Sequence, residues 1–387
     1  MLRKKRVNRM SLYFDNAATT VHKPSVVAKR VTEVLSADSF GNPSRGAHLY
    51  SLRAYQVVEE TREAIKKLFH ATEGYEVAFT NNATVALNEV LKGIIRPGDH
   101  VITTSWEHNS VLRPLYQLEQ AGAQLDFVTS ETSTGCLNYQ EFEEKVRPDT
   151  KVVVCNHASN VTGNVLDLER VKTFCKKYDL LLVLDISQTA GVLSIDLSDE
   201  EIAAVCFTGH KSLYGPQGTG GVCVRKDIVV EPVLTGGDGM RSFSKTQPKE
   251  FPTLLEAGTA NVPGIAGLGA AVQWGLENPA PAQEIVGRYF IKRLQELPNI
   301  SVYGDMNQQR VNVFSLNIAD ADSALVSDLL WEDYEIATRS GYHCAPLMHE
   351  ALGTAARGTV RFSFSRFTTQ KEIDQVVQAL SEVAGRK

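Results

Sequence analysis

Short apolar runs that alternate with helical patterns constrain the fold of this chain more than any other feature. Seven runs are rich in β-branched and aromatic residues, and segments between them carry apolar residues at helical spacing. This alternation predicts a mostly parallel sheet covered by helices on both faces, with ligands beyond the carboxyl ends of the strands. The predicted strands span residues 75–80, 99–105, 124–130, 151–157, 180–185, 203–209 and 220–226.

The pattern changes after about residue 265. Two helical segments, 286–297 and 370–385, flank the strand-like runs 300–305, 310–318 and 358–365, which predicts a smaller α+β domain. We therefore expect three parts: an N-terminal arm with a basic tail and a strand, a large domain, and a small C-terminal domain. Their expected limits are 1–20, 21–265 and 266–387.

Composition is that of a soluble globular protein of 387 residues with a net charge of −5, which argues against nucleic-acid binding. The basic stretch of residues 1–10 is interpreted as a solvated tail or as an over-long start with Met10 as an alternative initiator. No apolar segment follows it, which argues against a secretory signal. The uncharged run 257–276 contains five Gly and one Pro and predicts a loop leading into a buried helix rather than a membrane span. Six scattered cysteines without metal-ligand spacing predict no metal site and favour a reducing cytoplasm.

Two charged residues follow apolar strands, Asp185 and Lys211. Asp185 is either a helix cap or the partner of a cation, because an isolated buried carboxylate is costly. Lys211, before a Gly-rich loop, is either half of an ion pair or a desolvated amine that can form a Schiff base. Together they suggest a pyridoxal phosphate site, in which Asp185 faces the pyridinium nitrogen and Lys211 holds the aldehyde carbon.

Donors for a phosphate group also follow strands. Thr84 lies where "TNNATVALNEV" turns from strand to helix, and helix N-termini bind anions. Thr208 and His210, beside Lys211, are further candidates, and the ring of His108 can stack on a pyridine. Each of these residues also has an ordinary structural interpretation, as a helix cap or a structural histidine.

Cys344 differs from the other cysteines because it lies in the loop-like stretch "RSGYHCAPLMHEALGT". Arg339 and His343 are expected to favour its thiolate, whereas the other five cysteines read as buried and inert. Arg361 can bind a substrate carboxylate in bidentate fashion, although for this residue in isolation an ordinary salt bridge is the better explanation.

The ordered motifs resemble the class V aminotransferase group of pyridoxal phosphate enzymes, and within it cysteine desulfurases and selenocysteine lyases. The resemblance extends from about residue 12 to the C-terminus and implies the aspartate-aminotransferase-like fold, known as fold type I. "RSGYHCA" is similar to the short loop of group II desulfurases. The motifs are "FDNAATT", "GNPSRGAH", "EHNS", "HASNVTG", "LDISQTAGV", "TGHKSLYGPQGTGG", "EAGTAN" and "RSGYHCA".

The resemblance implies a role for each candidate residue. Lys211 corresponds to the Schiff-base lysine, Asp185 to the partner of the ring nitrogen, and Cys344 to the residue that receives sulfur. Around the cofactor, the resemblance implies that Gln188 binds the phenolic oxygen, His108 stacks on the ring, and Thr84, Thr208, His210 and a neighbouring subunit's Thr259 bind the phosphate. For the substrate it implies Asn160 and Arg361 as carboxylate ligands, with Arg339 shaping the loop and the site entrance.

The expected function is that of a homodimeric cysteine desulfurase with shared active sites, which passes sulfur from L-cysteine through a persulfide on Cys344 to an acceptor protein. The alternatives are a selenocysteine lyase acting on L-selenocysteine, a supplier of sulfur or selenium to a metal-cofactor enzyme, a class V transaminase or epimerase, and a non-catalytic sulfur-relay scaffold. Three features depart from the commonest family pattern: Ala83 beside Thr84, the extra residue in "HKSLYGP", and "GGDGM".

Overall fold

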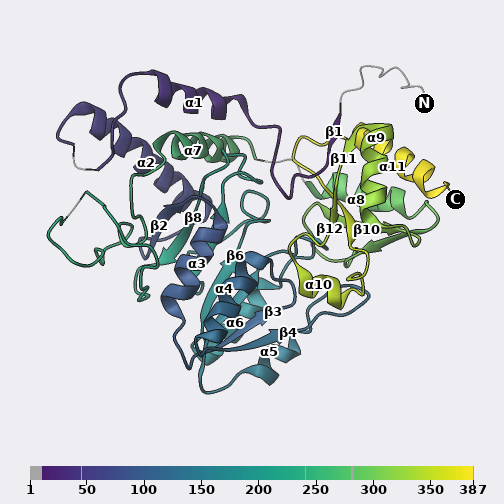
Figure 1. Ribbon diagram of the computed structural model, residues 1–387, viewed down its shortest axis with the longest axis horizontal. Helices are drawn as coiled ribbons and strands as arrows, with labels where there is room; N and C mark the ends of the chain where they lie inside the picture. The colour runs from purple at the N-terminus through teal and green to yellow at the C-terminus, as the bar shows by residue number, and fades with distance from the viewer. Residues whose placement is uncertain (1–10, 45, 240, 280–282, 387) are drawn as a thin grey trace.

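A mostly parallel seven-stranded sheet forms the larger part of the computed structural model, which describes residues 11–44, 46–239, 241–279 and 283–386 (Figure 1). The strand order is β2-β8-β7-β6-β5-β3-β4. Strand β8 runs antiparallel to both neighbours, and the other pairings are parallel. All seven predicted strands are confirmed within two residues: β2 (Tyr75–Thr80), β3 (His100–Thr104), β4 (Gln124–Val128), β5 (Thr150–Asn156), β6 (Leu181–Asp185), β7 (Ala204–Thr208) and β8 (Gly220–Arg225).

Strand β6 illustrates why the apolar runs predicted a sheet covered on both faces. Successive side chains of a strand point to opposite faces. Leu182 and Leu184 enter the buried cluster that includes Phe69 and Phe174, whereas Val183 enters the cluster on the other face. Helices α2 (Leu49–Leu68) and α6 (Leu168–Tyr178) contribute to the first cluster, and α3 (Ala83–Ile94) and α4 (Asn109–Gln120) to the second. The short helix α5 (Gln140–Lys145) adds Phe142 to the first cluster.

Helix α7 (Val262–Glu277) packs against α1 (Ser25–Ser36) and α2. Small residues permit this contact, since a Cβ added to Gly269 would lie 2.2 Å from Thr61 Oγ1. The buried helix expected after residue 257 is therefore present, and no helix in the described residues has the length and apolarity to cross a membrane. Because the expected domain limit at residue 265 falls inside α7, we propose that the large domain extends to residue 277.

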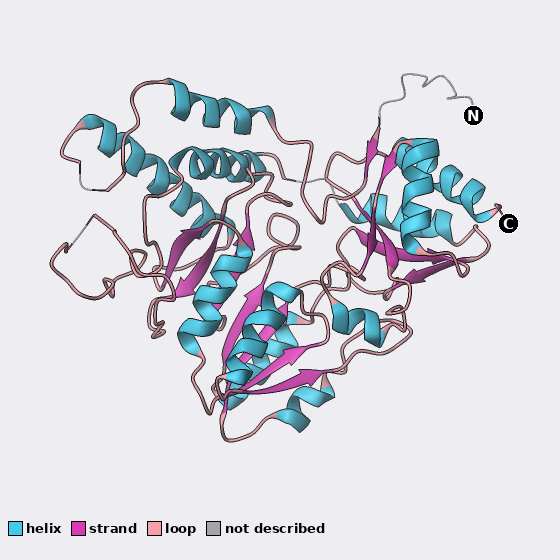
Figure 2. Ribbon diagram, in the orientation of Figure 1, coloured by secondary structure: helices cyan, strands magenta, loops and turns pink. Residues whose placement is uncertain are grey.

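A second sheet of four antiparallel strands, in the order β12-β13-β10-β9, forms the other part of the molecule. Its helices lie together on the right of Figure 2, and Phe290, Phe314 and Phe362 fill the core. The expected elements of this region are confirmed within three residues. The five expected elements are α8 (Gln283–Leu294), β9 (Ile300–Tyr303), β10 (Val313–Ile318), β13 (Thr359–Ser363) and α11 (Gln370–Ala384). The region also contains three elements that were not expected, α9 (Ser323–Tyr334), β12 (Arg339–Gly341) and α10 (Pro346–Ala351).

The N-terminal segment crosses to this second sheet. Strand β1 (Leu12–Tyr13) pairs in parallel with β11 (Ile336–Ala337), and Phe14 is buried among the aromatic rings of the small core. The segment thereby carries the residues that follow it to the region between the two sheets. The basic residues 1–10 lie outside the described residues.

Candidate active site

A cavity of about 230 Å³ lies where strands β5, β6 and β7 end. Ligands of parallel α/β sheets bind beyond the carboxyl ends of the strands, so the position agrees with the expectation from the sequence. Eleven of the twelve side chains expected at the site line this cavity: Thr84, His108, Asn160, Asp185, Gln188, Thr208, His210, Lys211, Arg339, Cys344 and Arg361.

Asp185, the last residue of β6, is buried at 4% exposure. Burial raises the pKa of its carboxyl group, while the backbone N–H of Ser187, 2.9 Å from Oδ1, and the charge of Lys211 act in the opposite direction. The nearby side chain of Gln188 donates from Nε2 to the carbonyl oxygen of Ala17 at 3.2 Å. Asp185 can therefore accept a hydrogen bond from, or pair with, a cation that enters the cavity.

Lys211 lies three residues beyond the end of β7. Burial lowers the pKa of its amine to about 8, and the negative charge of Asp185 opposes this shift. The loop is held by Thr20, whose Oγ1 lies 3.1 Å from the carbonyl oxygen of Lys211 and 3.0 Å from that of His210. A substantial fraction of neutral amine makes Lys211 a candidate nucleophile near neutral pH.

Groups that can donate hydrogen bonds to an anion lie beside Lys211. Helix α3 begins after Asn82, whose Oδ1 accepts from the N–H of Val85 at 3.0 Å, and Thr84 lies in its first turn. The hydroxyl of Thr208 is buried and has no hydrogen-bond partner among the described residues. An unpartnered buried hydroxyl beside a helix N-terminus suits a ligand that brings acceptor oxygens, such as a phosphate.

The ring of His108 caps helix α4 and is neutral. Its Nδ1 accepts from the backbone N–H of Ser110 at 3.1 Å. Burial, reinforced by the charge of Lys211, lowers the pKa of His108 to about 3. A fixed, uncharged aromatic ring at the cavity wall can stack on another ring.

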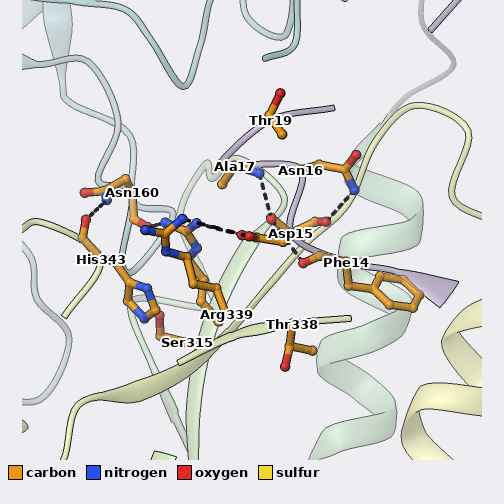
Figure 3. Close-up of polar contacts among 12 residues, drawn as sticks. Phe14, Asp15, Asn16, Ala17, Thr19, Asn160, Ser315, Thr338, Arg339 and His343 are labelled. Atoms are coloured by element: carbon orange, nitrogen blue, oxygen red, sulfur yellow. Dashed lines mark hydrogen bonds and ion pairs between the residues drawn. The ribbon is translucent and has the colours of Figure 1, made fainter. Parts of the chain in front are cut away.

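At the other end of the cavity, Arg361 of β13 is buried at 3% exposure. Its Nη1 donates to the carbonyl oxygen of Asn160 at 3.1 Å, and its Nη2 to Asp15 Oδ1 at 3.0 Å. The Nε of Arg361 and the Oδ1 of Asn160 have no partner among the described residues. Arg339 Nη1 lies 4.0 Å from Asp15 Oδ2, and Figure 3 shows these two side chains facing each other.

Cys344 lies between β12 and α10 and is exposed. It and His343 both adopt left-handed backbone conformations, with φ of 58° and 49°. Two hydrogen bonds fix this strained turn: Asn160 Nδ2 donates to the His343 carbonyl at 2.7 Å, and the N–H of Asn109 donates to the Cys344 carbonyl at 2.7 Å. The thiol is thus presented both to the cavity and to the surface.

The expectation that His343 helps to form the Cys344 thiolate is wrong. Burial lowers the pKa of His343 well below its usual value, so the ring is neutral at physiological pH. Its Nε2 instead pairs with Thr359 Oγ1 at 3.1 Å, which ties the turn to β13. Arg339 lines the same cavity as Cys344.

The profile of the family Aminotransferase class-V matches residues 12–376. The chain belongs to the class-V aminotransferase family. A probable cysteine desulfurase of Methanothermobacter thermautotrophicus is 30% identical and covers 97% of this chain and 95% of that protein. The cysteine desulfurase IscS of Vibrio campbellii is 29% identical, covering 96% and 92%.

Solved structures support the same class-V fold. The apo cysteine desulfurase of Thermococcus onnurineus has a TM-score of 0.89 at 29% identity, covering 97% of this chain and 94% of that chain. The cysteine desulfurase CsdA of Escherichia coli has a TM-score of 0.84 at 27% identity, with the same coverage. The resemblance found in the sequence and the predicted fold class are thereby confirmed.

Thr259 is the one expected site residue of this class-V chain that does not line the cavity around Lys211. It lines a separate cavity of about 590 Å³, together with residues of α2 such as Tyr55 and Arg62. Glu256, three residues earlier, pairs with Arg62 and accepts from the N–H of Phe79 at 2.7 Å. The loop of Thr259 is thus anchored to β2, and a contact with a neighbouring subunit stays a prediction.

Sequence reasoning missed two acidic residues near the site. Asp15 lies in "FDNAATT", and its place in that motif was the only feature of the sequence that could have marked it as a site residue. Glu107, in "EHNS", is completely buried and accepts from Thr104 Oγ1 at 2.6 Å and from the N–H of Asn156 at 3.0 Å. Burial raises the pKa of Glu107 to about 8, so this side chain links the ends of β3 and β5 mostly as a neutral acid at pH 7.

Proposed function

We propose that the protein is a pyridoxal-phosphate-dependent cysteine desulfurase. It would convert L-cysteine to L-alanine and carry the sulfur as a persulfide on Cys344. One observation carries the proposal: Asp185, Lys211 and Cys344, which are far apart in the sequence, line one cavity. The similarity over nearly the whole chain to proteins named cysteine desulfurases supports the same reaction.

The residues of the cavity fit pyridoxal phosphate. Lys211, with its lowered pKa, would bind the aldehyde carbon, and the buried carboxylate of Asp185 would meet the ring nitrogen. The unpartnered hydroxyl of Thr208, with Thr84 and His210, would hold the phosphate, and His108 would lie against the ring. When bound, the cofactor supplies an electron-withdrawing ring that makes the α-proton of the substrate acidic.

The chain's own groups account for the remaining steps. Arg361 and Asn160 would bind the substrate carboxylate, because the guanidinium still has an unpartnered Nε. The Lys211 amine, freed by the substrate, would move the α-proton, since its pKa of about 8 lies near neutral pH. The Cys344 thiolate would then attack the substrate sulfur.

In that attack, an S–S bond forms to Cys344 and the C–S bond of the substrate breaks. The electron pair of the C–S bond stays with the substrate carbon, which then takes a proton. The product that leaves is alanine. The sulfur remains on Cys344 as a persulfide, so that no further oxidant is required. Because Cys344 is exposed, a thiol of an acceptor protein would reach it from the surface.

We also propose a homodimer with shared active sites. Helix α2 carries Leu49, Tyr50, Leu52 and Tyr55, each about half exposed, on a chain whose other large apolar residues are mostly buried. Residues of the same helix line the cavity that contains Thr259. A second copy seated on α2 would cover these side chains and bring a phosphate within reach of that loop.

The test compares wild type with Cys344→Ser, using Cys136→Ser as the matched cysteine control. Alanine, sulfide and selenide are measured from L-cysteine and L-selenocysteine, with and without a reductant. We expect Cys344→Ser to keep the absorbance of the bound cofactor and to lose turnover of L-cysteine, while Cys136→Ser keeps both.

Other outcomes would replace the proposal. Undiminished turnover of L-cysteine in Cys344→Ser would remove that residue from the reaction. Strong preference for L-selenocysteine would identify a selenocysteine lyase, and keto-acid or racemised products would identify a transaminase or epimerase. Turnover only in the presence of a partner protein would favour the relay scaffold.

A further inference from the structure

The two ring nitrogens of His210, which lies in the loop after β7, have different surroundings. Its Nδ1 lies 3.0 Å from the hydroxyl oxygen of Thr19. Its Nε2 has no hydrogen-bond partner among the described residues, and the side chain lines the cavity that contains Lys211. One nitrogen is therefore bound by the N-terminal segment, and the other is left for a ligand.

The N-terminal segment holds the side chain of Thr19 in place. The N–H of Thr19 donates to the carbonyl of Asp15 at 3.3 Å, and its carbonyl accepts from the hydroxyl of Tyr13 at 2.9 Å. The N–H of the next residue, Thr20, donates to the carbonyl of His210 at 3.1 Å. Figure 3 shows Thr19 on the same segment as Asp15. Thr19 thus approaches the ring from a stretch of chain that is hydrogen-bonded on both sides of it.

The single hydroxyl proton of Thr19 has two acceptors within reach, both on His210. Nδ1 lies 3.0 Å from Oγ1, and the carbonyl oxygen lies 3.3 Å from it. That carbonyl already accepts from the N–H of Thr20, and the hydroxyl of Thr20 and the ammonium group of Lys23 lie 3.0 Å and 3.4 Å away. Because Nδ1 has no other donor among the described residues, the hydroxyl of Thr19 donates to Nδ1.

The ring of His210 is neutral, so it carries a single N–H. Burial lowers the pKa of His210 to about 4, and the positive charges of Lys211 and Lys23 act in the same direction. In a neutral imidazole, the hydrogen bond made by one nitrogen decides the role of the other. Since Nδ1 accepts from Thr19, Nε2 carries the proton and is a hydrogen-bond donor. A phosphate group, whose oxygens accept hydrogen bonds, requires this form of the ring.

We propose that Thr19 is a positioning residue that fixes the tautomer of His210. It keeps the one ring proton on Nε2, where a phosphate group can accept it. Without the hydroxyl of Thr19, the ring would also adopt the Nδ1–H form, in which the lone pair of Nε2 would repel a phosphate oxygen. Thr19 itself does not line the cavity, so it acts through His210. The inference rests on the proposed function, because it takes the ligand of His210 to be the phosphate of the cofactor.

The first test reads the tautomer by nitrogen NMR of the full-length protein with isotopically labelled histidines, both cofactor-free and cofactor-loaded. The signals of His210 are identified by their absence from His210→Gln. In the wild type we expect two widely separated nitrogen signals, with the proton coupled to Nε2. In Thr19→Val the separation should shrink, because the ring exchanges between its two forms. Thr19→Ser keeps the hydroxyl and should keep the wild-type pattern.

The second test measures the Kd for pyridoxal phosphate and for pyridoxal, which lacks the phosphate, by fluorescence titration. We expect Thr19→Val to raise the Kd for pyridoxal phosphate about fivefold, as for the loss of one ordinary hydrogen bond, and to leave the Kd for pyridoxal unchanged. Thr19→Ser should match the wild type with both compounds.

Thr150→Val is the matched control, because Thr150 Oγ1 lies 2.8 Å from Nδ1 of His100 in the same kind of contact. These two residues begin β5 and β3, at the opposite ends of the strands from the cavity. Thr150→Val should therefore leave both Kd values unchanged.

A proton on Nδ1 of His210 in the wild type would overturn the inference, whether or not the variants fold. An unchanged tautomer or an unchanged Kd for pyridoxal phosphate in folded Thr19→Val would also overturn it. The same holds if Thr19→Ser behaves like Thr19→Val, or if the Kd for pyridoxal rises as much as that for pyridoxal phosphate.

Release of alanine from L-cysteine by the wild type is measured in parallel, so that the two proposals can fail separately. If the wild type releases alanine while His210 carries its proton on Nδ1, only the tautomer inference is wrong. If the wild type binds pyridoxal phosphate and responds to Thr19→Val as expected but releases no alanine, the desulfurase proposal is wrong and the role of Thr19 stands.

Discussion

The lowered pKa of Lys211 predicts how fast the cofactor-free protein captures pyridoxal phosphate at each pH. Only the neutral amine attacks an aldehyde. With a pKa of about 8 rather than 10.5, about one tenth of the Lys211 amine is neutral at pH 7 instead of about 3 in 10,000, a gain of about 300-fold. We therefore expect the capture rate to rise about tenfold per pH unit up to about pH 8 and then to level off.

The assay mixes cofactor-free protein with pyridoxal phosphate between about pH 6 and about pH 11 and follows the absorbance of the bound cofactor. Lys211→Arg should abolish the signal. Lys23→Arg is the matched control, because burial also lowers the pKa of Lys23 to about 8 but this residue does not line the cavity. Since the charge of Asp185 raises the pKa of Lys211, Asp185→Asn should move the midpoint to lower pH. A rate that still rises above pH 10, or one that Lys23→Arg removes, would refute the reasoning.

Two further predictions concern buried polar groups of the site. Thr208→Val removes a hydroxyl that has no hydrogen-bond partner among the described residues, so the free energy of unfolding of the cofactor-free protein should not fall. The Kd for pyridoxal phosphate should rise about tenfold, because a hydrogen bond to a charged group is lost. An unchanged Kd in a fluorescence titration would contradict the assigned phosphate contact. Because the pKa of Glu107 is raised, the folded protein keeps a proton that the unfolded chain releases between about pH 4.5 and about pH 8. As the pH rises through this range, the free energy of unfolding of the wild type should fall relative to that of Glu107→Gln, by on the order of a few kcal/mol. Urea unfolding at the two ends of this range checks the difference, and a constant gap would show that Glu107 is ionised when folded.

The architecture was predictable because its strands are apolar on both faces, as Leu182, Val183 and Leu184 illustrate. The direction of β8 was not deduced, since its composition matches that of its parallel neighbours. A physical signal was nevertheless present. Residues 209–219, which join β7 to β8, contain no helical pattern, and a parallel crossover normally requires one. Helix α2 was likewise missed, although Ala54, Val57 and Ile65 fall on one buried face.

The candidate site was predictable where each residue follows a strand of the large sheet, as Asp185 and Lys211 do. Asp15 was not, because its partner Arg361 lies 346 residues away and no local pattern links them. Strand β1 is only two residues long, too short to be recognised by periodicity. The neutral state of the His343 ring could also not be predicted from the sequence, because it depends on burial of the ring in the folded chain.

The N-terminal segment explains how residues of both parts of the molecule come to line one cavity. Asp15 contacts Arg361 of the small sheet, and the carbonyl of Ala17 accepts a hydrogen bond from Gln188, which lies three residues beyond the end of β6. Thr20 then binds the carbonyl of Lys211. Residues 15–20, six in all, therefore connect the end of the cavity at Arg361 to the end at Lys211. The N–H groups of Ala18 and Thr19 donate to the carbonyl of Asp15 in a turn, so the contacts to Arg361 and to Lys211 come from one short, hydrogen-bonded segment. The motif "FDNAATT" thus acts by positioning both ends of the site.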